Sequence, residues 1–365
     1  MVMGKRDDVA TASPPIAAIA VAGLAQQVVN GVVKTAFRKP WQGPSSVAHN
    51  LGRATTRQVI RSFMGYSSSL PIEEFRSVEV VLDDLCRVVL PPVVRSLGVD
   101  LRAGEVGGVP GLWYRRRDRE PVGTILYLHG GGYIGTSPTM YAAFTAWIAH
   151  ETACEIFVAD YRLAPEFPYP AGRDDALAVV RALLDEGTDP TRLFVAGDSG
   201  GGGLASSLLL AIQDEGLPTP AGLVLFSPEV DLILDEPSVT DNASRDILPW
   251  NIPVAAYVHG VDPSSTAVSA IYADCSHYPP TMVVFGDDEM FRDPIRRFVA
   301  VLEAGGVDTT VVEEAGMFHV FPILMPWADG SRRAYRAVGR FVAERLVALD
   351  PAKLPDAESV PAVND

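Results

Sequence analysis

From about Val109 onward, short apolar runs alternate with longer stretches that have a helical pattern. The apolar runs are Thr124–Leu128, Glu155–Ala159, Leu193–Ala196, Gly222–Phe226, Thr281–Phe285 and Thr309–Val312. The helical stretches lie near residues 139–151, 173–186, 203–214, 293–304 and 331–347. Strands that are apolar on both faces and alternate with helices indicate an α/β fold with a mostly parallel sheet covered on both sides. Ligands bind such sheets beyond the carboxyl ends of the strands, so functional residues are expected there.

The composition narrows the partners that this chain is expected to have. Its 365 residues allow one large α/β domain with an attached cap. A formal net charge of −15 repels nucleic acid and anionic membranes, so we expect neither as a partner. The three cysteines, Cys86, Cys154 and Cys275, are widely spaced and form no C-x-x-C pair. We therefore expect reduced thiols and no metal site.

The longest apolar stretch, Ile16 to Val33, lies near the N-terminus and is interrupted by three side-chain amides. It thus falls short of the uninterrupted run of roughly 18 apolar residues that a membrane span needs. Ser13-Pro14 fits the N-cap and first position of a helix. We expect an amphipathic helix of a cytoplasmic protein, with one face made by Ile16, Ile19, Gly23, Val28 and Val32. A cleaved export signal is the alternative, because basic residues precede the stretch.

The pentapeptide Gly197–Gly201 reads G-x-S-x-G and directly follows the apolar run Leu193–Ala196. A helical stretch comes directly after it. This is the context in which such a serine sits on a tight strand-to-helix turn, with its hydroxyl exposed to a substrate. The glycines let the backbone fold closely, and the helix N-terminus adds positive potential. The motif predicts that Ser199 is a nucleophile.

A second glycine motif, His129-Gly130-Gly131-Gly132, ends the apolar run Thr124–Leu128. An acyl-transfer enzyme must bind a tetrahedral oxyanion with fixed donors, and glycine amides can approach it closely. An HGGG run after an early strand, followed later by G-x-S-x-G, is typical of esterases. We interpret His129 as a structural residue that orients this loop.

The general base is expected to be His319, which follows the last strand-like run and precedes the final helix. The order serine, acid, histidine along the chain is the one that this kind of fold uses. Carboxylates after the run Thr281–Phe285 compete for the role of the acid; they are Asp287, Asp288, Glu289 and Asp293. Glu289 falls in the loop at the sheet edge, whereas Asp293 precedes a proline and reads as a helix N-cap.

Over roughly residues 109–345 the chain resembles the hormone-sensitive-lipase-type carboxylesterases, which have the α/β-hydrolase fold. The matching segments are His129–Gly132, the motif around Ser199 with Gly200 in place of alanine, Tyr161–Glu166 with Pro168–Ala171, and Ser227-Pro228 with Asp231-Leu232. The resemblance implies that Gly131, Gly132 and Gly200 supply the oxyanion N–H groups. It also favours Glu289 as the acid, since Glu289 lies 30 residues before His319, and leaves Asp293 as runner-up. Gly203 departs from the family's asparagine and is expected to loosen the turn.

By the same analogy, residues 1–75 and an insertion at about 232–260 form a helical cap. Residues 76–350 then form the catalytic domain, and 351–365 a flexible tail. The expected function is a serine carboxylesterase for short- to medium-chain acyl esters, which needs no metal or organic cofactor. A lipase or an amidase with the same triad is the alternative, and a catalytically silent ligand-binding protein is a more remote one. The sequence leaves peripheral lipid contact and a homodimer open.

Overall fold

The computed structural model describes residues 9–37, 41, 46–248 and 254–347, and these contain one eight-stranded sheet. The strands are β1 (Val99–Val106), β2 (Val109–Arg116), β3 (Thr124–Leu128), β4 (Glu155–Ala159), β5 (Leu193–Asp198), β6 (Gly222–Phe226), β7 (Thr281–Gly286) and β8 (Thr309–Glu314). They lie in the order β1-β2-β4-β3-β5-β6-β7-β8. β1 and β2 pair antiparallel, β2 is antiparallel to β4, and β3 to β8 are all parallel.

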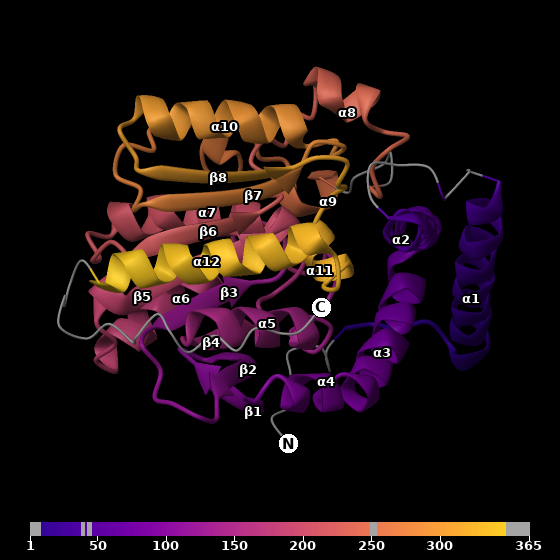
Figure 1. The fold of residues 1–365 in the computed structure, drawn as a ribbon, viewed down its shortest axis with the longest axis horizontal. Coiled ribbons are helices and arrows are strands. Elements are labelled where there is room, and N and C mark those ends of the chain that lie inside the picture. Colours follow the sequence, from indigo (N-terminus) through magenta and orange to yellow (C-terminus); the bar gives the residue numbers. More distant parts are fainter. Residues whose placement is uncertain (1–8, 38–40, 42–45, 249–253, 348–365) are drawn as a thin grey trace.

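Helices cover both faces of this sheet (Figure 1). They are α4 (Pro91–Ser96), α5 (Ala142–Thr152), α6 (Ala171–Asp185), α7 (Ser199–Asp214), α10 (Arg292–Ala304), α11 (Phe321–Leu324) and α12 (Asp329–Val347). Alternate side chains of β3 enter different cores. Leu126 and Leu128 pack in the cluster with α6, α7 and α10, whereas Ile125 and Tyr127 pack in the cluster with α5 and α12. Because both faces of the central strands are buried, these strands are apolar throughout, as the sequence predicts.

The six predicted strands are confirmed as β3 to β8, with ends within two residues of those expected. The hairpin of β1 and β2 was not predicted. Its first strand is largely exposed between its buried ends, so it lacks a clear apolar signal. The hairpin turns at Gly107-Gly108, and both glycines have positive φ. It adds two antiparallel strands at one edge of the parallel sheet.

Before the sheet, the chain forms the helices α1 (Pro14–Ala36), α2 (Val47–Ser67) and α3 (Ile72–Val89), which lie to one side of the sheet with α1 outermost (Figure 1). The predicted helix start is confirmed, since Ser13 is the N-cap residue and Pro14 the first residue of α1. The predicted apolar face is not the face that α1 buries. The buried residues of α1 are Ala20, Leu24, Gly31 and Thr35. The exposed ones include Ile16, Ile19, Val28 and Val32.

Close approach between α1 and α2 explains which face of α1 is buried. A Cβ on Gly31 would lie 2.7 Å from Val59 Cα, and a Cβ on Gly23 would lie 2.2 Å from Tyr66 Oη. Tyr66 also donates a hydrogen bond to Ala20 O at 2.9 Å. Small residues therefore make this contact, and the large aliphatic side chains of α1 point elsewhere.

The predicted insertion contains two short helices, α8 (Pro237–Asp241) and α9 (Val254–Val258). Residues 249–253 and the predicted tail at 351–365 lie outside the described residues. α8 contacts the loop that follows β7, because Ser238 Oγ donates to Met290 O at 2.7 Å. The insertion is thus packed against the edge of the sheet at which β7 ends.

Candidate active site

Ser199 stands at the junction of β5 and α7, where the chain passes from strand to helix without an intervening loop. Its φ is +51°, in the left-handed region that side chains disfavour. A Cβ on Gly197 would lie 2.4 Å from Gly201 O, and a Cβ on Gly201 would lie 2.2 Å from Leu128 O. Both positions require glycine, because the turn packs backbone against backbone beside the end of β3.

Ser199, His319 and Glu289 meet beyond the carboxyl ends of β5, β8 and β7. Ser199 Oγ lies 2.8 Å from His319 Nε2, which can accept its proton. His319 Nδ1 lies 3.3 Å from Glu289 Oε2. All three side chains are buried. The structure thus brings together the predicted serine, histidine and favoured acid, from positions as far as 120 residues apart.

The second carboxylate oxygen of Glu289 is held by two donors. Ser227 Oγ donates to Oε1 at 2.7 Å, and Gly286 N–H donates to it at 2.6 Å. Ser227 Oγ in turn accepts from the N–H of Val320, next to His319, at 3.0 Å. Burial raises the pKa of Glu289, and the two hydrogen bonds oppose that rise. These contacts leave Oε2 directed to the imidazole.

His319 is held through both its ring and its backbone. Phe291 packs edge-on against it, with ring centroids 5.1 Å apart. Asp246 accepts hydrogen bonds from the backbone N–H groups of His319 at 2.9 Å and of Met290 at 2.7 Å. Burial lowers the pKa of His319, although the carboxylates of Asp246 and Asp198 oppose the change. The lowered pKa keeps the imidazole neutral at neutral pH, which is the form that accepts a proton.

Two supporting residues of this site were missed from the sequence. Ser227 was noted only as part of a family motif, without a role. Asp246 lies in a stretch that carries no motif, so no sequence signal identified it. Both are buried polar residues that link the acid loop to the histidine loop.

The other candidate acids lie away from the imidazole. Asp293 pairs with Arg292 at 2.8 Å and accepts from Ser238 N–H at 3.0 Å. The Arg292 guanidinium lowers the pKa of Asp293. The predicted N-cap role is wrong, because α10 already begins at Arg292 and places Asp293 inside its first turn. Ser238 Oγ accepts the N–H of Asp293, which helps the helix start earlier. Among the remaining two, Asp287 accepts from Gly316 N–H and Asp288 faces Arg57 and Arg245.

The glycine loop after β3 has backbone conformations that favour glycine. Gly131 has φ +117° and Gly132 has φ +60°. A Cβ on Gly131 would lie 2.3 Å from Gly135 O, so no larger residue fits there. The loop packs over the start of α7, since a Cβ on Gly200 would lie 3.0 Å from Tyr133 N. The three predicted oxyanion glycines therefore lie in one neighbourhood, beside Ser199.

Buried polar contacts hold this loop to the serine turn. Asp198 accepts from Gly130 N–H at 2.9 Å and from the hydroxyls of Tyr127 and Tyr141, each at 2.8 Å. Burial raises the pKa of Asp198 to about 6, while these hydrogen bonds oppose the rise. The residue before Ser199 is thus a buried link between the two glycine motifs.

His129 has the structural position that was expected of it. Its ring stacks on Tyr161, with centroids 4.6 Å apart, and its Nδ1 lies 2.9 Å from Thr136 Oγ1. Gly203, which was expected to loosen the turn, instead leaves room for a contact. A Cβ there would lie 2.3 Å from Tyr133 Oη, whose hydroxyl donates to Glu229 O at 3.3 Å. α7 runs unbroken from Ser199.

The described residues contain no group of three or more His, Cys, Asp or Glu side chains that could hold a metal ion. Cys86, Cys154 and Cys275 are free thiols. Burial raises the pKa of Cys154 to about 12 and that of Cys275 to about 11. Neither buried thiol is therefore ionised at neutral pH, so the serine is the nucleophile that this geometry supports.

Comparisons with known proteins show which family this chain matches. A family described as alpha/beta hydrolase fold matches residues 125–323. An acetyl-hydrolase from Streptomyces hygroscopicus is 34% identical over 241 residues, which cover 65% of this chain and 80% of that protein. Carboxylesterase NlhH from Mycobacterium tuberculosis is 35% identical over 241 residues, covering 61% of this chain and 75% of that protein. The crystal structure of the HSL homologue EstE7 from a metagenome library aligns with a TM-score of 0.70 at 30% identity, over 80% of this chain and 98% of that chain.

Proposed function

The chain belongs to the alpha/beta hydrolase fold family, and we propose that it is a serine carboxylesterase with Ser199 as nucleophile, His319 as general base and Glu289 as triad acid. One observation carries the proposal: Ser199 Oγ, the His319 ring and the Glu289 carboxylate form a continuous chain of contacts of 2.8 and 3.3 Å. Glu289 orients the ring and stabilises its cation, as the acid of such a triad does.

In the acylation step, His319 Nε2 takes the proton of Ser199 Oγ while this oxygen attacks the ester carbonyl carbon. Negative charge develops on the carbonyl oxygen. The N–H groups of Gly131, Gly132 and Gly200 are the proposed donors that stabilise it. The bond to the alcohol oxygen then breaks, and His319 gives its proton to the leaving alcohol.

Deacylation repeats this chemistry with water. His319 takes a proton from a water molecule, whose oxygen attacks the acyl carbon attached to Ser199. The tetrahedral intermediate collapses, the carboxylic acid leaves, and Ser199 Oγ regains its proton. Neither step requires a metal or an organic cofactor.

Labelling and mutation test the nucleophile. A fluorophosphonate should label Ser199, as mapped by peptide mass spectrometry. Ser199→Ala should lower ester turnover by on the order of 10⁴ or more, because the triad acts as a unit. Labelling at another serine, or an active alanine variant, would refute the assignment.

Short- to medium-chain acyl esters are the proposed substrates. The Streptomyces relative is named an acetyl-hydrolase, which points to small acyl groups. Ser199 is 7% exposed and His319 is 2% exposed, so both are largely shielded from solvent. A series of p-nitrophenyl esters of increasing acyl length should give its highest kcat/KM at the short or medium members. Highest activity on long-chain emulsions would indicate a lipase instead, and turnover of p-nitroanilides an amidase.

Residues 1–75 are proposed to form the cap, together with the insertion at about 232–260. We place the protein in the cytoplasm, with α1 retained in the folded chain, because the contacts of Gly23 and Gly31 integrate α1 with α2. An exported form would lack this helix. The mass of the protein isolated from its cells distinguishes the two.

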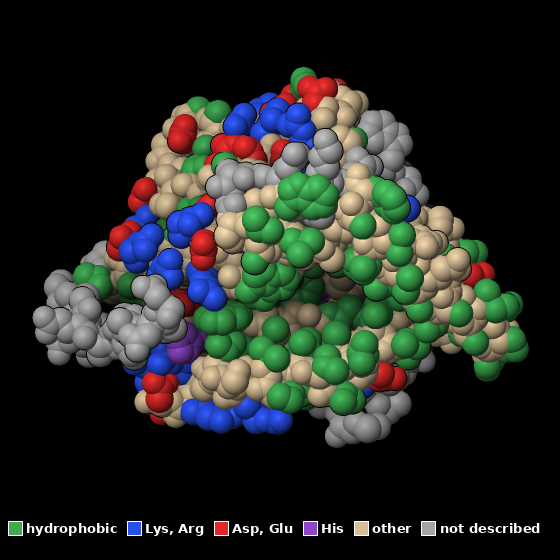
Figure 2. All heavy atoms as spheres, turned by 45° about the vertical axis from the view of Figure 1, so that its right-hand side comes forward, with side chains coloured by type: hydrophobic (Ala, Val, Ile, Leu, Met, Phe, Trp, Pro, Cys, Tyr) green, Lys and Arg blue, Asp and Glu red, His purple; other side chains and the backbone are tan. Residues whose placement is uncertain are grey.

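The exposed side of α1 is proposed to touch neutral lipid. In contrast to the expectation from the interrupted stretch Ile16 to Val33, α1 is long and apolar enough by length and composition to cross a membrane, and little of it is buried. Its exposed apolar residues are Ile16, Ile19, Val28, Val29, Val32 and Val33. Figure 2, which brings this side forward, shows hydrophobic side chains gathered around a hollow. Because the net charge is −15, an uncharged lipid surface fits better than an anionic one.

Sedimentation with phosphatidylcholine vesicles tests this contact. The variant Ile19→Gln with Val29→Gln should sediment less than the parent protein. The control Val311→Gln alters an exposed apolar residue on β8 and should leave sedimentation unchanged. A stable dimer by light scattering, with no vesicle binding, would show that a second copy covers this side.

A further inference from the structure

α3, most of which follows the proposed cap of residues 1–75, reaches the glycine loop that follows β3. Glu79 is 5% exposed and accepts a hydrogen bond from Thr136 N–H at 2.5 Å. One helical turn further on, Asp83 accepts from Ser137 Oγ. A Cβ on Gly135 would lie 2.9 Å from Glu79 Oε1, so the loop passes directly against this carboxylate. α3 thus holds the loop itself.

Thr136 passes this restraint on to the glycines. Thr136 has φ +69°, and its Oγ1 donates to Gly130 O at 2.5 Å. A trans peptide unit is planar, so the C=O of Gly130 and the N–H of Gly131 point in opposite directions. His129 Nδ1 lies 3.0 Å from the same Gly130 oxygen, so the contacts of Thr136 and His129 together also fix the direction of the Gly131 N–H.

The next peptide unit is fixed in the same way. Gly131 O accepts from the N–H groups of Ile134 and Gly135 at 3.2 and 3.1 Å. By the same planarity, this holds the N–H of Gly132 pointing away from those donors. The directions of the Gly131 and Gly132 N–H groups are thus set by the hydrogen bonds that the carbonyl groups of Gly130 and Gly131 accept.

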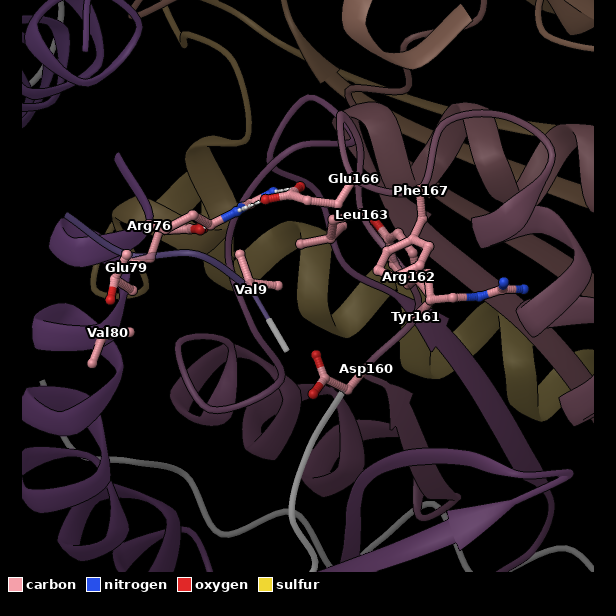
Figure 3. Close-up of a pocket in the computed structure, with 11 residues that line it drawn as sticks. Val9, Arg76, Glu79, Val80, Asp160, Tyr161, Arg162, Leu163, Glu166 and Phe167 are labelled. Atoms are coloured by element: carbon pink, nitrogen blue, oxygen red, sulfur yellow. Dashed lines mark hydrogen bonds and ion pairs between the residues drawn. The ribbon is translucent and has the colours of Figure 1, made fainter. Parts of the chain in front are cut away.

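Arg76 fixes Glu79 in turn. Its Nη1 donates to Glu79 Oε2 at 2.6 Å, so the two carboxylate oxygens of Glu79 serve different partners. Its Nη2 donates to Glu166 Oε2 at 2.6 Å and to Ala164 O at 2.8 Å. Figure 3 shows Arg76 extending from α3 to Glu166 beside a small cavity that Asp160 also lines. Arg76 is 6% exposed and Glu79 is 5% exposed, so the ion pair between them is shielded from solvent and holds Glu79 at the loop.

We propose that Glu79 is a positioning residue for the oxyanion amides. Through Thr136 it fixes the peptide between Gly130 and Gly131, and Arg76 keeps it in place. The inference rests on the proposed function, because the direction of these amides affects turnover only if an oxyanion forms beside them. α3, whose residues Arg76 and Glu79 lie just after the proposed cap of residues 1–75, then contributes to kcat.

The pair Glu79→Met and Glu79→Gln tests the role. Methionine has a similar length but no acceptor for Thr136 N–H, whereas glutamine keeps a carbonyl oxygen there. Loss of a whole oxyanion donor costs about 10²- to 10³-fold in kcat, so a misdirected donor should cost about 10- to 100-fold. We expect Glu79→Met to show this loss with KM little changed, and Glu79→Gln to retain more activity.

Affinity for a trifluoromethyl ketone gives a readout that a purely structural role would not change. Its adduct with Ser199 places an oxyanion on the same amides, so its Ki should rise by the factor by which kcat/KM falls. Thr136→Val removes the hydroxyl that binds Gly130 O and that also contacts His129 Nδ1. It should show the same paired change if the Glu79 variants do not fold. Thr136→Ser should restore activity.

The matched control is Asp175→Asn. Asp175 is also a buried helix carboxylate that binds an arginine and a backbone N–H, both of Arg162. It should change the melting temperature without changing Ki. Unchanged kcat and Ki in both Glu79→Met and Thr136→Val would overturn the positioning role. If fluorophosphonate still labels Ser199 in the parent protein, the proposed function stands even then; if it does not, the function itself fails.

Discussion

Replacing Glu289 by glutamine should disable the general base while leaving the fold intact. In the parent protein, Oε1 of Glu289 accepts from Ser227 Oγ and Gly286 N–H. A glutamine must keep its carbonyl oxygen toward these two donors, so its NH₂ group faces His319 Nδ1. That nitrogen must then accept a hydrogen bond, which moves the ring proton to Nε2. His319 is then held in the tautomer that cannot take the proton of Ser199.

The wrong tautomer lowers kcat by about 10³- to 10⁴-fold in such triads, or about 4 to 5 kcal/mol in the activation barrier. The assay is kcat on p-nitrophenyl acetate, together with the melting temperature. Asp293→Asn is the control: it loses an ion pair with Arg292 and a favourable charge in the first turn of α10. It should cost about 0.5 to 1 kcal/mol of stability and leave kcat unchanged. The reasoning is refuted if Glu289→Gln keeps kcat within about tenfold of the parent, a barrier change of under about 1.4 kcal/mol, or if Asp293→Asn is the variant that loses turnover.

Further predictions concern pH, packing and the N-terminal helix. Because burial lowers the pKa of His319, the acid limb of kcat/KM should lie below the ordinary histidine pKa of about 6.5; a limb above that value contradicts the assignment. Gly201→Ala should destabilise the fold by about 3 kcal/mol, whereas Gly65→Ala, with open space at its Cβ, should be neutral or stabilising in thermal melts. Burial raises the pKa of Glu229 to about 8, so the native state binds a proton that the unfolded state has already lost at neutral pH. The free energy of unfolding of the parent protein should therefore fall, relative to that of Glu229→Gln, as the pH rises from about 5 to 9. Deleting residues 1–40 should change acyl-chain preference more than kcat on acetate, and an unchanged preference in the ester series would remove this segment from the cap.

The sequence predicted the central part of this molecule because its signals are local. A strand, a turn and a helix around Ser199 occupy consecutive residues, and the glycines there are required by backbone contacts. Glu289 could be placed because it follows β7, which is buried throughout. His319 could be placed by its order along the chain, after the last strand-like run and before the final helix. Parallel strands then bring these loops to one edge of the sheet.

The supporting contacts could not be predicted, because each joins residues that share no pattern. Arg53 donates to Gly316 O and Arg61 donates to Asp246 O, each at 2.8 Å and across more than 180 residues. In the sequence these arginines read only as a polar side of α2. Glu79 reads equally as a solvated helix residue, and only the fold shows that it is buried beside Thr136.

The face that α1 buries could not be predicted for a related reason. The sequence shows one apolar face made mostly of large aliphatic residues, whereas helix packing at Gly23 and Gly31 depends on the absence of side chains. From the sequence alone, a glycine in a helix indicates lower helix stability and does not indicate a packing contact. The choice between these readings depends on the partner helix, which the segment itself does not reveal.

The small number of buried side chains in α1 has a consequence for how the molecule unfolds. Few large side chains of α1 are buried, so little free energy holds this helix against local unfolding. α2 and α3 are tied to the loops through Arg61 and Glu79, and should open only with the sheet. The amide hydrogens of α1 should therefore exchange with solvent as a separate cooperative unit, well before those of α3. We therefore expect α1 to unfold and refold locally while Ser199, His319 and Glu289 keep their arrangement.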